Sequence, residues 1–430
     1  YDHLGGGFSR YSVDDKWLVP HFEKMLYDNA ILGGAYLDAY RLTGKNNYRV
    51  ICIEILEYIL REMSHPKGGF YSAEDAETDG VEGAFYLWTK KEVFSLLPSQ
   101  EATLFCEYYD VTEEGNFEGK NILHPVYPLE EFVDYKGIDQ EMVEQSLKRS
   151  RAILFEARAT RKRPFKDDKI LTSWNALMID TLARCGFAFG EKRFIDAARL
   201  AAEFIRENLW KEGKLLRRYR EGATDYEGSL DDYVFMIRAL ITLYEGGLGE
   251  KYLEWAIEMA HLLEREFKAD EGAFYLTGPN HSILLRRCEL YDSSLPSGNA
   301  VHAENLIRLY QITYHRDFWI QAEDILKVAR AFLEAFAQGA CYHLLSMHRY
   351  FNKQLPNLVI ALKDKEEGKA ELQKHLFSRL YPHLAFSWKE GESEYPLKEG
   401  KTTFYLCIHG KCQPPLTDWD ALEKALESLN

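Results

Sequence analysis

A chain of 430 residues with 46% hydrophobic and 28% charged residues has the composition of a globular protein with one large core or two to three smaller ones. Its formal net charge of −15 argues against general binding to nucleic acids or anionic membranes, because both need a basic partner surface. No run of about 18 apolar residues and no signal-peptide pattern occurs. Seven cysteines are too few for a disulfide framework in a chain of this length, so we expect a reducing compartment, the cytoplasm.

The segment 5–30 carries an unusual concentration of charged and aromatic side chains where a loop runs into a helix. An ordinary helix start needs one cap and an acidic residue in its first turn. The excess favours residues that face a ligand, and a salt-bridged junction between loop and helix is the alternative. Because Tyr1 leads directly into Gly5, we expect a fragment without its natural N-terminus. The side chains in question are Arg10, Asp14, Asp15, Lys16, Trp17, His21, Glu23, Lys24, Tyr27 and Asp28.

Four segments rich in small and apolar residues predict helices that are buried on all sides, at 30–40, 175–189, 233–247 and 299–314. A tight turn follows each of them, and then an amphipathic helix with one charged face, such as the segment 193–210. A helix buried all round is an inner helix, and its amphipathic partner is an outer one.

Inner and outer helices in alternation predict a mainly α fold, the (α/α)6 toroid of six-hairpin glycosidases. A looser region, with helices expected near 90–109 and 139–159, supplies one more hairpin and brings the number to five. We expect the first hairpin of the ring to be absent with the N-terminus. An open α-solenoid is the less favoured alternative, since solenoid repeats more often keep one fixed length.

After Leu355 the periodicity changes, and we expect a small α/β appendage. Segments 356–362, 383–388 and 402–408 read as strands, and segments 366–381 and 418–429 read as helices. The expected domains are therefore a toroid at 1–355 and an appendage at 356–430.

The loops that lead from each outer helix to the next inner helix must meet at one rim of such a ring. These loops are rich in aromatic and acidic residues, and inner-helix N-termini with their free N–H groups point at the same rim. Aromatic rings that stack on C–H surfaces and carboxylates that accept hydroxyl protons are the groups that bind sugars. The loops are 68–75, 82–88, 167–175, 225–233, 271–275 and 291–302.

Paired carboxylates are the candidate catalytic groups. Crowding raises the pKa of one member of such a pair, which places an acid beside a base. Asp231 and Asp232 form one pair, with an N-cap and a first-turn acid as the structural alternative. Glu74 and Asp75 form the other. His21 is a candidate general base, although a lone histidine is more often a packing residue.

Metal and cofactor motifs are weak in this chain, and we expect neither group. Asp75-x-Glu77-x-Asp79-Gly80 resembles a calcium loop, but Tyr86 occupies the position of the bidentate glutamate. Cys407-x4-Cys412 is neither a redox C-x-x-C pair nor half of a zinc site, which favours a structural role.

Several motifs together resemble one family. The segments GGGFSRYSVDDKWLVPHFEKMLYDNA, GGFYSAEDAE, EGAFYLWT, DDKILTSWNALMI and FYLCIHGKCQPP, among others in the same order, are similar to the YyaL-like, spermatogenesis-associated protein 20-like family of thioredoxin-domain-containing proteins. The resemblance implies a six-hairpin toroid, akin to those of glycosidases and N-acylglucosamine 2-epimerases. It also implies a thioredoxin-like domain in cis that this chain does not contain.

The residues expected to bind ligand are drawn from these motifs and from the rim loops. The family motifs map onto part of this set and also onto the acid/base candidates His21, Glu74, Asp75, Asp231 and Asp232. The expected ligand-binding set is Arg10, Trp17, Glu23, Lys24, Asp28, Asp168, Lys169, Trp174, Asn175, Tyr233, Ser297, Asn299 and His302.

Three functions are compatible with these residues. The first is an enzyme that hydrolyses or isomerises a sugar or related polyhydroxylated metabolite, with Trp174 and Tyr233 as stacking surfaces. The second is a non-catalytic module that binds a sugar or a protein for the attached thioredoxin-like domain. The third is a scaffold whose rim residues satisfy one another, since a toroid by itself does not define a function.

Overall fold

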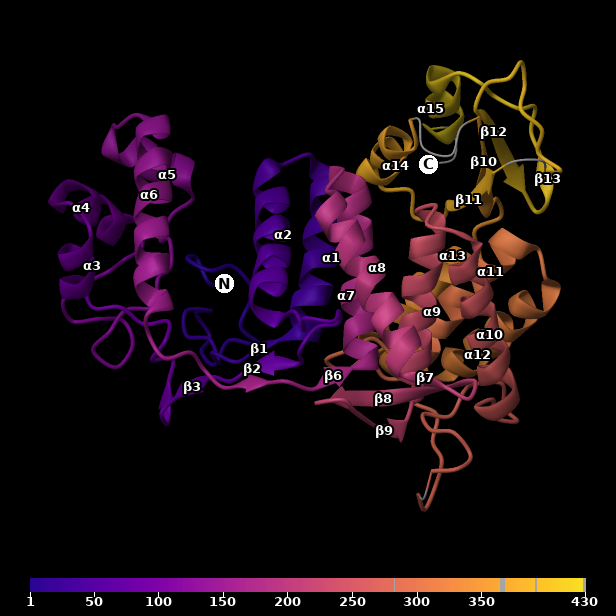
Figure 1. Cartoon of the computed structure of the whole chain (residues 1–430), viewed down its shortest axis with the longest axis horizontal. Helices are drawn as coiled ribbons and strands as arrows, with labels where there is room; N and C mark the ends of the chain where they lie inside the picture. Colours follow the sequence, from indigo (N-terminus) through magenta and orange to yellow (C-terminus); the bar gives the residue numbers. More distant parts are fainter. Residues whose placement is uncertain (282, 364–367, 391–392, 428–430) are drawn as a thin grey trace. The chain divides into compact units, whose positions relative to one another are not determined.

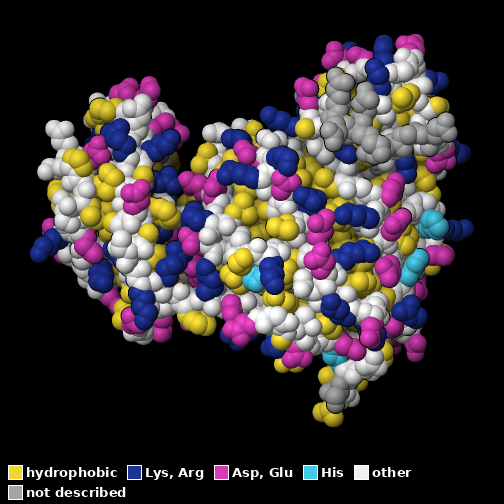
Figure 2. Space-filling model, in the orientation of Figure 1, with side chains coloured by type: hydrophobic (Ala, Val, Ile, Leu, Met, Phe, Trp, Pro, Cys, Tyr) yellow, Lys and Arg dark blue, Asp and Glu magenta, His cyan; other side chains and the backbone are white. Residues whose placement is uncertain are grey.

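The computed structural model describes residues 1–281, 283–363, 368–390 and 393–427. The chain divides into two compact units, each considered by itself below. The first unit comprises residues 1–33, 47–64 and 70–168, and the second comprises 34–46, 65–69 and 169–430. Figure 2 shows acidic and basic side chains interspersed over the face in view.

Helical hairpins build the second unit, as the sequence predicted (Figure 1). In each hairpin a buried helix precedes an amphipathic one, with only two to four residues in the turn between them. Adjacent inner helices pack against one another, α7 on α9 and α9 on α11. The hairpins are α7 (Thr172–Phe189) with α8 (Lys192–Asn208), α9 (Leu230–Glu245) with α10 (Glu250–Glu266), and α11 (Gly298–Thr313) with α12 (Arg316–Phe336). The mainly α fold class with helical hairpins is thereby confirmed.

Glycine permits the closest approach between two of these inner helices. Gly246 follows α9, and a Cβ atom at this position would overlap the ring of Phe187 on α7. The Phe187 side chain is 1% exposed and fills the space where another residue would have its side chain. Close helix packing of this kind leaves no room for an added methyl group.

Charged side chains lie between the inner helices, and each has a partner of opposite charge. Arg238 donates to Asp180, which also accepts from the hydroxyl of Thr242 at 2.6 Å. Arg308 on α11 donates to Glu245 on α9 at 2.6 Å. Buried charges are tolerated when they are paired and hydrogen-bonded, so these contacts set the register of one inner helix against the next.

The appendage after residue 355 has the predicted α/β composition. β10 (Pro356–Leu362) pairs in parallel with β11 (Ala385–Glu390) and antiparallel with β12 (Thr403–Ile408), and the edge strand β13 (Lys411–Cys412) follows. The helices α14 (Lys369–Ser378) and α15 (Trp419–Glu427) complete it (Figure 1). The helical ends predicted at 366–367 and 428–429 lie outside the described residues. The domain boundary at residue 355 stays a prediction.

Side chains tie the appendage to the ends of the inner helices within the second unit. The Trp388 indole N–H donates to the carbonyl oxygen of Glu245 at the end of α9. The Gln311 amide on α11 donates to the carbonyl oxygens of Pro356 and His383. α13 (Cys341–Tyr350) packs on α11 in the same unit. The bond from Trp388 satisfies a backbone acceptor that the C-terminus of α9 leaves open.

Helices and a small sheet form the first unit, which contains the start of α1 (Leu26–Thr43) and most of α2 (Asn46–Tyr58) with its π-helical extension (Ile59–Met63). The helix predicted near 90–109 is interrupted at Pro98 and forms α3 (Lys90–Leu96) and α4 (Ser99–Tyr108). The helix predicted at 139–159 is α6 (Gln140–Ala159). α5 (Leu129–Lys136) was not predicted.

The sequence analysis also missed several short strands. In the second unit, β8 pairs with β6, β7 and β9. β6 and the end of β9 lie in the loops 167–175 and 225–233, which were interpreted only as carriers of ligand-binding residues. They are β6 (Ile170–Leu171), β7 (Trp210–Lys211), β8 (Lys214–Arg220) and β9 (Ala223–Glu227), and the first unit adds β3 (Glu77–Thr78) and β4 (Val81–Glu82).

A capping box defines the start of α9. The Ser229 backbone N–H and hydroxyl both donate to one carboxylate oxygen of Asp232 at 2.9 Å. The other oxygen accepts from the backbone N–H of Ser173 on α7, also at 2.9 Å. Asp232 is completely buried. One carboxylate therefore caps its own helix and fixes the start of the neighbouring inner helix.

We predict that Asp232→Ala lowers the free energy of unfolding by about 3 kcal/mol, because it leaves buried N–H donors without acceptors. Urea denaturation followed by circular dichroism measures the change. Asp231→Ala is the matched control, since this carboxylate makes no hydrogen bond within the described residues, and we expect it to cost far less. Equal losses in the two variants would contradict the prediction.

Candidate functional site

A three-stranded sheet in the first unit gathers three of the predicted motif segments. β1 (Lys24–Met25) pairs with β2 (Ala73–Glu74), which pairs with β5 (Lys166–Asp167). In this register Lys24 lies opposite Glu74, and Glu74 lies opposite Lys166. Segments that are distant in the sequence thus meet as neighbouring strands.

Hydrogen bonds between polar groups of the same segment hold the loop before β1 in its conformation. Asp14 accepts backbone N–H bonds from Leu18 and Val19, and the Arg10 N–H donates to the carbonyl oxygen of Glu23. Trp17, a predicted ligand-binding residue, lies in this loop with φ of 58° and is 85% exposed.

Asp28 is a perturbed carboxyl group at the start of α1. It is half-buried, and burial is the main cause that raises its pKa to about 6. The charge of Arg10 opposes this shift and the charge of Glu23 adds to it. Asp28, Arg10 and Glu23 were all predicted site residues, and the structure brings them together.

His21 lies within reach of two carboxylates. Its Nδ1 is 3.0 Å from Glu82 Oε1 and its Nε2 is 3.7 Å from Glu23 Oε2. The imidazole stacks on the ring of Tyr11 and is half-exposed. The carboxylate of Glu82 beside Nδ1 fixes the orientation of the imidazole, and Nε2 faces the more distant carboxylate of Glu23.

Lys24 and Glu74 lie in a buried ionic cluster. The Lys24 ammonium donates to Asp2 Oδ2 and to the carbonyl oxygen of Gly6, both at 2.9 Å, and faces the ring of Tyr58. Burial lowers the pKa of Lys24. Glu74 accepts from the Tyr58 hydroxyl at 2.8 Å. These contacts explain how a lysine that is 1% exposed and a completely buried glutamate are tolerated.

Arginine side chains surround the same cluster. Arg163 donates to Glu74 at 2.9 Å, and Arg158 donates to both oxygens of Asp2. Together with Tyr86 they line a small pocket of about 10 Å³. None of these three residues was among the predicted site residues. Arg158 and Arg163 lie outside the motifs and gave no local signal, whereas Tyr86 lies in the rim loop 82–88 and in the motif EGAFYLWT.

The remaining predicted residues of this region differ in exposure. Asp75 is exposed, and its carboxylate accepts from the following backbone N–H of Ala76 at 2.7 Å. Asp168 and Lys169 are half-buried between β5 and β6, and both have interaction partners. Asp75 therefore does not share the buried surroundings of Glu74, with which it was paired in the sequence analysis.

Asp231 is the second perturbed carboxyl group, in the second unit. Burial, followed by the charge of Asp232, raises its pKa to about 7, and Arg217 opposes the shift. The charge of Glu289 adds to it. A Cβ atom at Gly298 would lie 2.5 Å from Asp231 Oδ1. The start of α11 therefore lies directly against this carboxylate.

Two predicted residues position the loop that carries Glu289. The Ser297 hydroxyl and the Asn299 amide both donate to the carbonyl oxygen of Glu289, at 2.9 and 3.1 Å. Asn299 also bonds to the backbone of Phe274 in both directions. Glu289 itself was not predicted, although an acidic residue two positions before Tyr291 in a rim loop was a usable signal.

The other predicted residues of the second unit belong largely to its packing. Tyr233 is 2% exposed, and its hydroxyl accepts from the Leu215 N–H, so its ring does not form an open stacking surface. His302 is completely buried, and burial lowers its pKa to about 3, which keeps the imidazole neutral. Asn175 is buried and donates to the carbonyl oxygen of Leu171. Trp174 is half-buried on the first turn of α7.

The described parts of the chain contain no group of three or more histidine, cysteine, aspartate or glutamate residues placed to hold a metal ion. They also contain no helix with the length and apolar character needed to cross a membrane.

Comparison with known proteins identifies relatives along nearly the whole chain. No protein-family model matches it. Human spermatogenesis-associated protein 20 is 33% identical over 478 residues, which covers 99% of this chain and 60% of the human protein. Uncharacterized protein B0495.5 of Caenorhabditis elegans is 29% identical, with 99% of this chain and 64% of that protein covered. The chain thus spans about three fifths of the length of these relatives.

Solved structures with some likeness include a D-mannose isomerase, at 13% identity and a TM-score of 0.39, covering 76% of this chain and 81% of that one. Cellobiose 2-epimerase from Bacillus thermoamylovorans is 13% identical with a TM-score of 0.36, over 77% of this chain and 82% of that one. Likeness of this degree carries no information on substrate. Over 99% of its own length the chain is a relative of spermatogenesis-associated protein 20, and the family resemblance that its motifs predicted is confirmed.

Proposed function

We propose that this chain binds a sugar or related polyhydroxylated metabolite where α9 and α11 begin, and that Asp231 transfers a proton to it in a hydrolysis or isomerisation. The observation that carries the proposal is the state of Asp231, a half-buried carboxyl group with a pKa of about 7. A group with this pKa is present in both the acid and the base form near neutral pH. That balance is what general acid–base catalysis requires.

The surroundings of Asp231 support a functional rather than a structural role. Asp232 next to it uses both carboxylate oxygens to hold the fold together, whereas Asp231 makes no hydrogen bond within the described residues. An unused carboxyl group with unfavourable desolvation destabilises the protein and is retained more readily when a ligand uses it. Helix N-termini beside it supply N–H donors for an oxygen-rich ligand.

The chemical class of ligand follows from the groups close to Asp231. Glu289 supplies a second carboxylate and Arg217 a half-exposed guanidinium. Carboxylates that accept hydrogen bonds and a guanidinium that donates them lie close together here, and the hydroxyl groups of a sugar can bond to both. Trp174 offers the half-buried aromatic surface at the start of α7, in place of the buried Tyr233.

We predict that a saccharide from a panel of mono- and oligosaccharides raises the melting temperature of the chain, because a ligand that binds the native state stabilises it by mass action. Asp231→Asn should keep this shift and lower any turnover of the same saccharide by about 10²-fold or more. Product formation measured by chromatography provides the second readout.

Asp225→Asn is the matched control, since Asp225 is an exposed carboxylate on the neighbouring strand β9 that pairs with Arg218 at 3.0 Å. It should change neither the thermal shift nor the turnover. A rise in melting temperature without product at any enzyme concentration would indicate a non-catalytic binding module. The absence of any shift with well-folded protein would reject the proposal.

We predict that Asp231→Asn stabilises the chain at pH 8 by about 1–2 kcal/mol, discounted for the partial exposure of the group. The raised pKa of Asp231 means that the folded protein holds this proton more tightly than the unfolded chain, so wild-type stability falls as the pH rises from about 4 to about 7. The Asp231→Asn variant does not lose stability in this way as the pH rises. Urea denaturation between pH 4 and 8 should therefore show a difference that vanishes at the acidic end, and a difference independent of pH would contradict the raised pKa.

The expectations on context remain part of the proposal. Because the chain spans three fifths of the length of its relatives, we propose that it functions beside a thioredoxin-like domain in cis. From the low number of cysteines we propose a cytoplasmic location. Analytical digestion and localisation of the full-length protein test these two points independently of the Asp231 experiments.

A further inference from the structure

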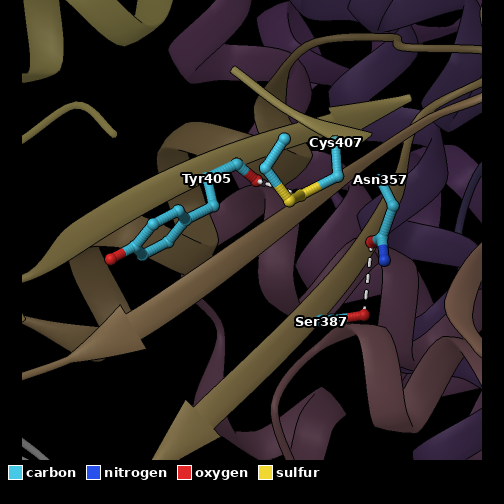
Figure 3. Close-up of a disulfide and its surroundings, with 5 residues drawn as sticks. Asn357, Ser387, Tyr405 and Cys407 are labelled. Carbon is cyan, nitrogen blue, oxygen red and sulfur yellow. Dashed lines mark hydrogen bonds between the residues drawn. A yellow bond between two sulfur atoms is a disulfide. The ribbon is translucent and has the colours of Figure 1, made fainter. Parts of the chain in front are cut away.

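Cys407 and Cys412 are joined by a disulfide bond, which the sequence analysis did not predict (Figure 3). The two residues lie directly opposite each other, Cys407 on β12 and Cys412 on β13. Figure 3 shows Cys407 beside Asn357 of the adjacent strand, with Tyr405 on the same strand as the cysteine. The remaining cysteines lie outside this disulfide: Cys52, Cys106 and Cys185 are buried, Cys288 is half-buried and Cys341 is exposed.

The disulfide bond adds little to the stability of this hairpin. The two cysteines are only five residues apart, and a short loop loses little entropy when it is closed. His409 and Gly410 both have positive φ and form the tight two-residue turn by themselves. Beyond the bond, Phe404 and Leu416 exchange two backbone hydrogen bonds, at 2.8 and 3.0 Å. Non-covalent contacts already hold the strands in register.

The two cysteine residues differ in exposure. Cys407 is completely buried, among Val359, Ala361 and Tyr405. Cys412 is exposed on β13, the edge strand of the sheet. Lys411 precedes Cys412, and the segment 403–415 contains no acidic residue. An incoming thiolate therefore reaches one sulfur only, and no fixed negative charge within the hairpin repels it.

We propose that Cys407–Cys412 is a thiol–disulfide exchange site that accepts electrons from a dithiol. One thiolate of the dithiol attacks Sγ of Cys412, which forms a mixed disulfide and releases Cys407 as a thiolate that takes up a proton. The second thiol of the donor then attacks the donor sulfur atom that is bonded to Cys412 in the mixed disulfide. This step releases Cys412. The donor leaves as a disulfide and the protein gains two thiols, so that two electrons and two protons are transferred.

The geometry selects a dithiol over a monothiol. After the first attack, Cys407 lies directly opposite Cys412 and returns to displace a monothiol before a second molecule arrives. A dithiol resolves the mixed disulfide intramolecularly and completes the reduction, since its second thiol is present at high effective concentration.

The test is reduction of the native chain, followed by alkylation and peptide mass spectrometry. Dithiothreitol should make Cys407 and Cys412 available to the alkylating agent, whereas glutathione at the same thiol concentration should reduce at least about tenfold less of the pair. In every native sample the exposed Cys341 should be alkylated and the buried Cys185 should not, which shows that the chain remains folded. Labelling of the pair only after denaturation would overturn the proposal.

Two matched serine variants test the direction of attack. Cys407→Ser leaves the exposed Cys412, and Cys412→Ser leaves the buried Cys407. Incubation with oxidised glutathione converts a reactive thiolate to a mixed disulfide and releases one glutathione thiol. We expect Cys407→Ser to react at least about tenfold faster than Cys412→Ser, with far-ultraviolet circular dichroism unchanged in both. Equal rates, or a faster Cys412→Ser, would overturn the assignment of Cys412 as the attacked sulfur.

Discussion

The carboxylate of Asp232 is the contact on which the arrangement of the proposed site depends. It holds the start of α9 through Ser229 and the start of α7 through the Ser173 N–H. Because the two inner helices share this acceptor, their N-termini are fixed relative to each other. The charge of the same group, after burial, contributes to the raised pKa of its neighbour Asp231. The structural residue thus creates the electrostatic condition that makes the adjacent residue a candidate acid.

Buried charge is handled differently in the Lys24 cluster of the first unit, comprising Lys24, Glu74, Asp2 and Tyr58. Here every strongly buried charge has a close partner, as in the contact between Lys24 and Asp2 at 2.9 Å. A paired charge is costly to disturb and has little capacity left for a ligand. This favours the salt-bridged junction, the alternative weighed for this segment, as the role of Lys24, while a ligand-binding role for the half-buried Asp28 with its raised pKa stays a prediction.

Hydrophobic periodicity predicted the helical hairpins and the appendage, because burial on all sides leaves an uninterrupted apolar pattern that a single sequence displays. The strands β8 and β9 escaped prediction, since Asp225 and Glu227 read as loop residues and their pairing with β8 depends on distant partners. The same limit applies to Arg163, whose contact with Glu74 spans 89 positions. The disulfide escaped because Cys407 and Cys412 were compared only with redox C-x-x-C and zinc spacings, and the small number of cysteines in the whole chain argued against disulfides.

The division of roles between Asp231 and Asp232 had a local signal. Ser229 is the N-cap of α9, which makes Asp231 the second and Asp232 the third helical residue. A side chain at the third position reaches back to the N-cap backbone, whereas one at the second position does not complete a capping box. The spacing Ser-x-x-Asp therefore assigns the structural role to Asp232 before any coordinates are known. Helix capping does not use the half-buried Asp231, and the proposed proton transfer is accordingly assigned to this member of the pair.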